Sequence, residues 1–449
     1  MVPAISKSEN NGVELFLTDR DRRMRVSRIC DDCFVLEANM ENLYWSDLTD
    51  VASSGIGGRV LFATDDWFAR CEYLISPKEP VFDPEAFTEY GKLMDGWETR
   101  RKRISGHDWC IIKLAAPSRV YGFEVDTAFF TGNQTPRFSI QGIALGPHDV
   151  PEDELHSQLR FPYQGDANHH PTPSSPQGGF AADADQSKAV AALKSEAWTE
   201  LLSMSELQPG YPDTRMHQFR AHIPDNHIVP VVTHLRLNMY PDGGIARLRV
   251  RGEIVRALKS GAVVDLAAAT NGGAALGSSN AHYGRASNLI APGRSRRMDQ
   301  GWETARNPNR PPILKKDPET GMLVLPKEMG EWALIRLASL AAVHSIEIDT
   351  DHFKGNCPEG VEVEYLRQER TISRSDELQE VDNNVNWVPL LVKRTRLTPH
   401  HQHIFTVQEG HLVEGAVATH VRLRMYPDGG IARLRVMGTP QGTSKSSNM

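Results

Sequence analysis

Two stretches of the chain are almost identical, and this internal repeat constrains the fold more than any other feature. Residues 233–250 read THLRLNMYPDGGIARLRV, and residues 419–436 read THVRLRMYPDGGIARLRV. Sixteen of the eighteen positions are the same. Self-similarity of this kind indicates two copies of one structural unit. We therefore predict two tandem domains, each of which ends in this stretch.

The repeated stretch has the pattern of two strands joined by a turn. Apolar and polar residues alternate over 233–240, which predicts a half-buried strand. Pro-Asp-Gly-Gly at 241–244 is typical of a chain reversal, and the alternation resumes over 246–250. We predict a β-hairpin whose polar face carries His234 and Arg236.

Other motifs match in the same order in the two halves. Gly-Trp-Glu-Thr occurs at 96–99 and again at 301–304. The matching order extends from about residue 60 to 250 and from about 275 to 436. Short strand patterns separated by turn residues dominate, and helical patterns are few. The sequence therefore predicts an all-β protein with one antiparallel β-sandwich per copy and loops gathered at the ends of the sheets.

The repeat and the composition divide the chain into segments. Residues 145–190 are rich in Pro, Ser, Gly and Gln and poor in apolar residues, which predicts an exposed insertion within the first copy. The other predicted segments are a lead-in over 1–50, a first repeat over 51–252, a linker over 253–274, a second repeat over 275–438 and a flexible tail over 439–449.

Charge and composition exclude some classes of partner. The net charge of −7 gives no basic excess for binding nucleic acid, and no apolar run is long enough to span a bilayer. Five cysteines, an odd number, favour a reducing compartment over a disulfide framework. We expect a cytoplasmic protein, with a peroxisomal location not excluded, that contacts neither nucleic acid nor membrane.

Several polar residues of the first copy have counterparts in the second, and they are the first candidates for a site. An arginine offers a planar fork for a carboxylate, an acidic side chain accepts N–H groups from a urea-like ligand, and a histidine or carboxylate moves protons. Each also has a structural interpretation, such as a turn cap for Asp126 or a solvated face for the hairpin. The candidates are Arg70, Glu98, Asp126, His234 and Arg236.

Three motifs together resemble the allantoicase family. They are the doubled Tyr-Pro-Asp-Gly-Gly-Ile-Ala-Arg, the FATDDWF of 62–68 and the DGWETR of 95–100. The resemblance covers about residues 50–440. It implies two tandem jelly-roll domains of the galactose-binding-like kind and a homo-oligomer. It also implies hydrolysis of allantoate to ureidoglycolate and urea, by cleavage of a C–N bond between the central carbon and a ureido group in purine (allantoin) breakdown.

The implied substrate assigns roles to residues. The first copy is the better catalytic candidate, because the second has Asn280-Ala281 and Ala305 at the places of Asp65-Asp66 and Arg100. An arginine would hold the carboxylate of allantoate, and acidic groups would orient the ureido arms and move protons. The expected catalytic residues are Asp66, Glu98 and His234, and the expected substrate-binding residues are Arg70, Arg100, Asp65, Asp126, Arg236, Tyr240 and Asp242.

Two questions stay open at this stage. Metal ligands are unknown, because Asp, Glu and His are present without a ligand-spacing signature, and a divalent ion such as manganese is the candidate cofactor. The alternative function is a tandem jelly-roll module that binds a carbohydrate or another ligand without catalysis, because a fold does not by itself give chemistry.

Overall fold

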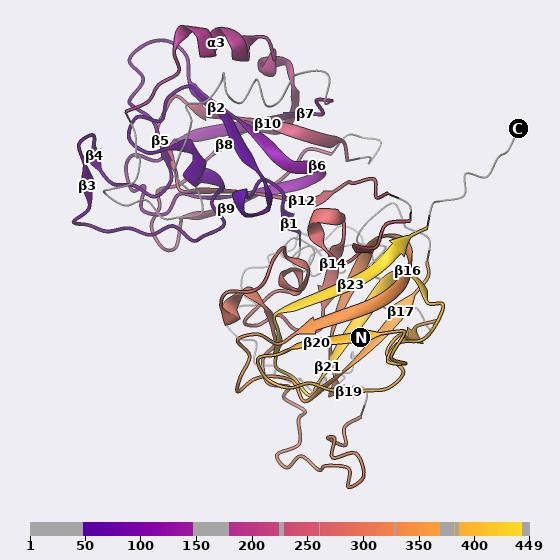
Figure 1. Cartoon of the computed structure of the whole chain (residues 1–449). Coiled ribbons are helices and arrows are strands. Elements are labelled where there is room, and N and C mark those ends of the chain that lie inside the picture. The colour runs from indigo at the N-terminus through magenta and orange to yellow at the C-terminus, as the bar shows by residue number, and fades with distance from the viewer. Residues whose placement is uncertain are drawn as a thin grey trace, which may run out of the picture. The chain divides into compact units, whose positions relative to one another are not determined.

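A computed structural model (Figure 1) describes most of both repeats. Residues 1–47 of the predicted lead-in, most of the insertion and most of the tail lie outside the described residues. The described residues are 48–146, 179–223, 229–259, 261–326, 329–368, 381 and 386–441.

The first repeat is built mainly from strands. Its strands are β1 (Thr49–Asp50), β2 (Arg59–Ala63), β3 (Phe87–Thr88), β4 (Gly91–Lys92), β5 (Trp97–Glu98), β6 (Asp108–Asp126), β7 (Arg137–Ile143), β8 (Thr199–Glu206), β9 (Met216–Arg220), β10 (Val231–Tyr240), β11 (Gly244–Ile245) and β12 (Arg247–Ile254). Its helices are the α-helix α3 (Ala184–Ala191) and the 3₁₀ turns η2 (Ser54–Ile56), η3 (Cys71–Ile75) and η4 (Ser195–Ala197).

The second repeat follows the same plan. Its strands are β13 (Val264–Asp265), β14 (Ala274–Ser278), β15 (Trp302–Glu303), β16 (Glu331–Asp349), β17 (Gly360–Leu366), β18 (Val388–Pro389), β19 (Thr395–Arg396), β20 (Gln402–Thr406), β21 (Val417–Tyr426), β22 (Gly430–Ile431) and β23 (Arg433–Pro440). Its 3₁₀ turns are η5 (Ala269–Asn271), η6 (Ala286–Ile290) and η7 (Met298–Gln300).

The two main sheets have the same strand order along their main path, and the second carries one more strand, because β19 pairs with β17. The first has the order β1-β12-β6-β10-β7-β8, with β2 and β9 also on β6. The second has the order β13-β23-β16-β21-β17-β18, with β14 and β20 also on β16. The pairings between these strands are antiparallel. The predicted all-β fold with two repeated jelly-roll domains is confirmed.

The long strand β6 changes the interpretation of the repeated stretch. Residues 108–113 and 118–119 of β6 pair with β10, whereas residues 118–126 pair with β12. The strands β10 and β12 are therefore separated by β6 and do not pair with each other, so the predicted hairpin is wrong. The connection between them has its own anchors, because Asp108 N donates to Pro241 O at 2.9 Å and Thr99 N donates to Gly243 O at 3.0 Å.

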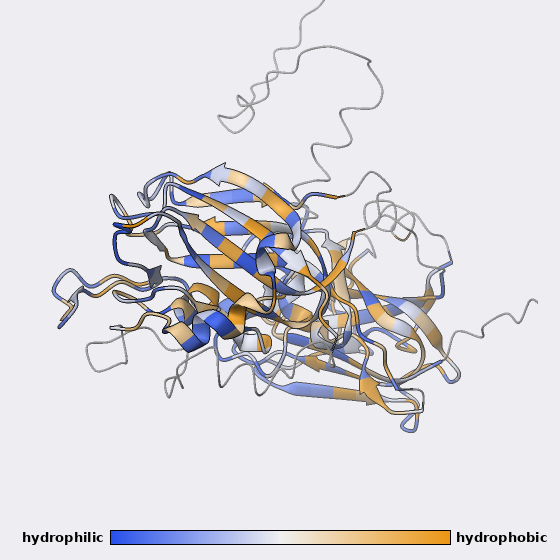
Figure 2. Ribbon diagram, turned by 90° about the horizontal axis from the view of Figure 1, so that it is seen from above, coloured by the Kyte–Doolittle hydropathy of each residue, from blue (hydrophilic) through white to orange (hydrophobic). Residues whose placement is uncertain are grey.

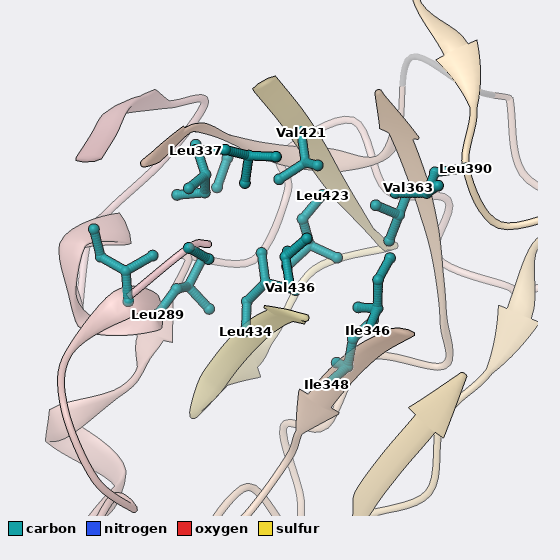
Figure 3. Packing of buried hydrophobic residues seen from close by; sticks show 14 of the residues in the cluster. Leu289, Leu337, Ile346, Ile348, Val363, Leu390, Val421, Leu423, Leu434 and Val436 are labelled. Atoms are coloured by element: carbon teal, nitrogen blue, oxygen red, sulfur yellow. The ribbon is translucent and has the colours of Figure 1, made fainter. Parts of the chain in front are cut away.

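Each repeat has its own apolar core. Trp97 and Trp302 are fully buried, and each indole Nε1 donates at 2.8 Å to a main-chain oxygen, that of Asp65 or of Asn280. A buried tryptophan whose N–H is satisfied both fills the core and fixes the loop that accepts the bond. Figure 2 shows hydrophilic and hydrophobic residues alternating along many strands, and Figure 3 shows Ile346, Leu423 and Leu434 within the core of the second repeat.

The end of the predicted insertion is ordered and covers the sheet. Asp183 caps α3 through a capping box with Gln186, which satisfies free N–H groups of the first turn. Val190 and Trp198 pack in one apolar cluster with Phe62 of β2. Most of residues 179–190 are exposed or half-buried, and Val190 is buried, whereas residues 147–178 lie outside the described residues.

The connection between the repeats is shorter than the predicted linker of 253–274. Strand β12 extends to Ile254, and β13 at Val264–Asp265 already pairs with β23 of the second sheet. The part of the chain that the structure describes contains no helix long and apolar enough to cross a membrane.

Candidate active site in the first repeat

A fixed guanidinium lies where the loop after β2 meets the end of β5. Asp65 Oδ2 accepts from Arg100 Nε at 2.7 Å, and Asp65 Oδ1 accepts from Arg100 N at 2.9 Å and from Trp67 N at 3.2 Å. The Arg100 guanidinium also lies over the Trp67 ring, 4.4 Å from its centroid. Its side chain remains 46% exposed, whereas that of Asp65 is 10% exposed. This arrangement holds a positive group rigidly at the surface, where it can bind an anion.

Glu98 lies on β5, two residues before Arg100. Its main chain exchanges hydrogen bonds with Ala69, and it is paired with Gly244 of β11. Its Oε1 accepts from Asn133 Nδ2 at 2.7 Å. Burial raises the pKa of Glu98 from its ordinary 4.5 to about 7, although the bond from Asn133 acts in the opposite direction. A carboxyl group with this pKa can both donate and accept a proton near neutral pH.

Asp66 and Arg70 lie beside this cluster, but both are buried. Asp66 Oδ2 accepts from Cys71 N at 3.4 Å, which fixes the start of η3. Arg70 pairs with Glu72 at 3.3 Å and lies 4.7 Å from the centroid of the Phe180 ring. Each residue is only 1% exposed. This burial favours a supporting role over the catalytic role predicted for Asp66 and the substrate contact predicted for Arg70, both of which stay predictions.

The structure places His234 and Arg236 on a covered face of the sheet, apart from Glu98. His234 is 2% exposed, with Nδ1 2.8 Å from Thr233 Oγ1. The Arg236 guanidinium lies 3.9 Å from the centroid of a Trp109 ring and donates to Ser195 Oγ at 2.7 Å. The segment from α3 to Trp198 covers this face. The apolar residues of this segment were a signal in the sequence that it packs on the sheet, so that the face beneath it is not solvated.

The remaining candidates also lie in other places. Asp126 forms an ion pair with Arg215 at 2.6 Å, and Asp242 Oδ2 accepts from Lys102 N at 2.7 Å. The hydroxyl of Tyr240 is 3.0 Å from Ser139 Oγ. Tyr240 also lines an open cavity of about 710 Å³, together with Gly106, His107, Pro136, Arg137, Met204, Glu206, Leu207 and Pro241. Of the ten predicted site residues, the structure gathers Asp65, Asp66, Arg70, Glu98 and Arg100.

The second repeat keeps only part of this arrangement. Asn280 Oδ1 accepts from Ala305 N at 3.0 Å, as Asp65 accepts from Arg100 N, but alanine supplies no guanidinium. Glu303 Oε1 accepts a short hydrogen bond from Asn356 Nδ2, as Glu98 does from Asn133. The carboxyl–amide pair is thus present in both repeats, whereas the arginine is present in one.

Asn133 is a site residue that the sequence analysis missed. It contacts Glu98 directly, yet it lies 35 positions further along the chain. The signal was available, because Phe-Thr-Gly-Asn at 130–133 corresponds to Phe-Lys-Gly-Asn at 353–356. Spacing alone did not relate this motif to β5.

The donor groups give no support for a metal centre. Among the residues that the structure describes, no three His, Cys, Asp or Glu side chains converge as a group that could hold a metal ion. The carboxylates of Asp65 and Asp66 are engaged by N–H donors. We therefore derive no step through a metal.

Comparisons with known proteins agree with the repeat and with its length. A family model described as the allantoicase repeat matches residues 49–255 and again residues 264–441. The chain belongs to the allantoicase family. The two matched ranges contain the two sheets, so each sheet corresponds to one copy of the repeat.

Individual relatives are similar over almost their whole length. The chain is 35% identical over 406 residues to a probable allantoicase of Pseudomonas paraeruginosa, which covers 90% of this chain and 99% of the relative. It is 34% identical over 393 residues to probable allantoicase 1 of Burkholderia mallei, covering 87% of this chain and 94% of that one. The crystal structure of allantoicase from Saccharomyces cerevisiae superposes with a TM-score of 0.58 at 29% identity, covering 90% and 98% of the two chains.

Proposed function

We propose that this protein is a hydrolase that converts allantoate to ureidoglycolate and urea, a step of purine degradation. The observation that carries this proposal is the match of both repeats to the allantoicase repeat. The relatives that bear the name probable allantoicase share nearly the full length of the chain.

The cluster around Glu98 suits the chemistry of allantoate. This molecule carries one carboxylate and two ureido groups on a single carbon. Arg100, which is held by Asp65 and Trp67 and is partly exposed, supplies the guanidinium for the carboxylate. Glu98 lies two residues before Arg100, and its carboxyl group, which accepts from Asn133 Nδ2, can face a ureido arm. A preoriented arginine loses little freedom on binding, which favours affinity.

Glu98 is the proposed proton carrier. The C–N bond between the central carbon and one ureido nitrogen breaks, and its electron pair goes to that nitrogen. Protonated Glu98 donates a proton to the departing nitrogen, which leaves as urea. Water adds its oxygen to the carbon and loses a proton to the ionised Glu98, which restores the acid. The net change is addition of one water to allantoate, giving ureidoglycolate and urea.

We assign this chemistry to the first repeat. The second repeat has Ala305 where the first has Arg100, and Asn280 where the first has Asp65. A site without the guanidinium would bind the carboxylate of allantoate weakly, because a charge-assisted pair is roughly twice as strong as a neutral hydrogen bond.

The test is urea release from allantoate by the purified protein. We expect release by the wild-type chain and its loss in Glu98→Gln. No release by folded wild-type protein would overturn the hydrolase assignment and favour the alternative, a binding module without catalysis.

The aromatic residues Phe82, Phe87 and Phe129 are exposed, which supports a homo-oligomer as part of the same proposal. Sedimentation analysis tests the homo-oligomer. The proposal also includes a cytoplasmic location.

A further inference from the structure

The loop that carries Asn133 is tied to the same strand that supports Glu98. Asn133 O accepts from Gly244 N at 2.8 Å, and Thr135 N donates to Gly244 O at 3.1 Å. Gly244 lies in β11, which is paired with Glu98 on β5. The side-chain bond between Asn133 Nδ2 and Glu98 Oε1 is therefore fixed at both ends by the main chain.

The second repeat contains the same construction. Gly430 N donates to Asn356 O at 2.9 Å, and Gly430 is paired with Glu303. The Asn356 side chain donates to Glu303 Oε1. The amide–carboxyl pair has thus been retained in a repeat that lacks the arginine. The amide–carboxyl pair is a structural feature of both repeats. Whether it affects the reaction depends on which carboxyl group, that of Glu98 or that of Glu303, it holds.

We infer that Asn133 is a positioning residue of the hydrolytic site, which orients the carboxyl group of Glu98 and favours its ionised form. This inference rests on the proposed function of Glu98. The geometry supports it, because an N–H group of a carboxamide can only donate, and a carboxylate is its best acceptor. The bond leaves Glu98 Oε2 as the oxygen that exchanges protons with the substrate.

Two opposing influences set the protonation of Glu98. Burial favours the neutral acid and is the larger influence, whereas the bond from Asn133 favours the carboxylate. Charged groups also lie on the elements packed around Glu98. These groups are Asp65, Asp66 and Arg70 on the loop after β2, Arg100 on its own segment, and Asp242 before β11.

The test compares the pH dependence of kcat/KM for wild type, Asn133→Leu and Asn133→Asp. Loss of the donor in Asn133→Leu raises the pKa of Glu98 by about one to two pH units, because the carboxylate loses a hydrogen bond that stabilises its charge. Asn133→Asp raises it further, because a second carboxylate opposes ionisation. We expect kcat to fall by about tenfold in Asn133→Leu with KM nearly unchanged, since the substrate contacts of Arg100 remain.

The internal repeat supplies a matched control. Asn356→Leu removes the equivalent bond to Glu303 and should leave the profile and kcat at wild-type values. Melting temperatures of all variants check that the fold is kept. If the pH dependence of kcat/KM is unchanged in folded Asn133→Leu, the inference is overturned, even if kcat falls. Failure of the proposed function has a different signature, which is full activity of Glu98→Gln or no urea release by wild type.

Discussion

Asp65 and Arg100 are joined by a side-chain ion pair and by a main-chain hydrogen bond, both to the same carboxylate. Arg100 Nη2 lies 2.6 Å from Asp65 Oδ2, and Arg100 N lies 2.9 Å from Asp65 Oδ1. In the second repeat, Asn280 keeps the main-chain bond to Ala305 at 3.0 Å, and the guanidinium is absent. The same loop conformation is thus formed with and without an anion-binding group.

Glu98→Gln tests whether the first repeat alone carries the proton transfer. We expect kcat to fall by about 10²–10⁴-fold, the usual contribution of a general acid or base. Glutamine keeps the volume and can still accept from Asn133, so the fold should persist. The matched variant Glu303→Gln should retain wild-type kcat. Equal losses in the two variants, measured by urea release, would contradict the assignment to one repeat.

Arg100→Gln removes the proposed carboxylate contact. We expect KM for allantoate to rise by about 10–100-fold, because a charge-assisted hydrogen bond contributes about 1.5–3 kcal/mol. The control is Arg137→Gln, since Arg137 forms an exposed pair with Glu206 at 2.9 Å, with side-chain exposures of 55% and 67%. Such pairs contribute about 0–1 kcal/mol. An unchanged KM in Arg100→Gln would place the carboxylate elsewhere.

The sequence predicted the repeat and the strand-rich fold because both leave local signals. Alternation with period two marks strands, and the matched Gly-Trp-Glu-Thr motif identifies Trp97 and Trp302 as equivalent residues of the two repeats. The pairing of strands had no local signal, because β6 is long enough to pair with β10 along one half and with β12 along the other. Adjacent strands joined by a turn therefore looked like a hairpin.

The candidate site could be predicted in part for a related reason. Glu98 and Arg100 are close in sequence to the buried Trp97, and Asp65, 32 positions before Trp97, joins them through the bond from the Trp97 indole to its main-chain oxygen. His234 and Arg236 were candidates because the stretch that carries them is almost identical in the two copies, and a solvated face was the alternative interpretation. Residues of 180–198, which cover this face, are distant in sequence and do not reveal their position from periodicity.

The raised pKa of Glu98 predicts how stability depends on pH. The folded-state pKa of about 7 exceeds the ordinary 4.5, so between these values the folded protein binds more protons than the unfolded chain. Stability therefore falls as pH rises through this window. Glu98→Gln cannot ionise, so it should be more stable than wild type at pH 8, by at most about 3 kcal/mol. The difference should vanish near pH 4, and thermal unfolding at both pH values measures it.

Chelation tests the proposal that side chains alone move the protons. We expect urea release to be unchanged after dialysis against a chelator, since the described residues offer no group of three metal-binding side chains. Loss of activity that manganese restores would contradict this expectation. It would also direct the search for ligands to acidic and histidine side chains beyond the described part of the chain.

Asp95→Ala tests the buried ion pair beneath the site. Asp95 Oδ1 accepts from Arg247 Nη2 at 2.8 Å, with side-chain exposures of 1% and 2%, and Asp95 Oδ2 accepts from Val81 N at 3.0 Å. Burial lowers the pKa of Arg247, which shows the cost of desolvating its charge. Removal of the carboxylate leaves that charge uncompensated, so we expect a loss of about 3–5 kcal/mol.

The second repeat provides the comparison for this loss. Arg433 Nη1 donates at 2.7 Å to the main-chain oxygen of Gln300, as Arg247 does to Asp95, but the Gln300 side chain carries no charge. Gln300→Ala keeps that oxygen and should cost less than about 1 kcal/mol, as is usual for surface substitutions. Unfolding in guanidinium chloride measures both variants. Equal costs would mean that Arg247 is held by its main-chain acceptors, Lys78 O and Asp95 O, and that the carboxylate of Asp95 adds little.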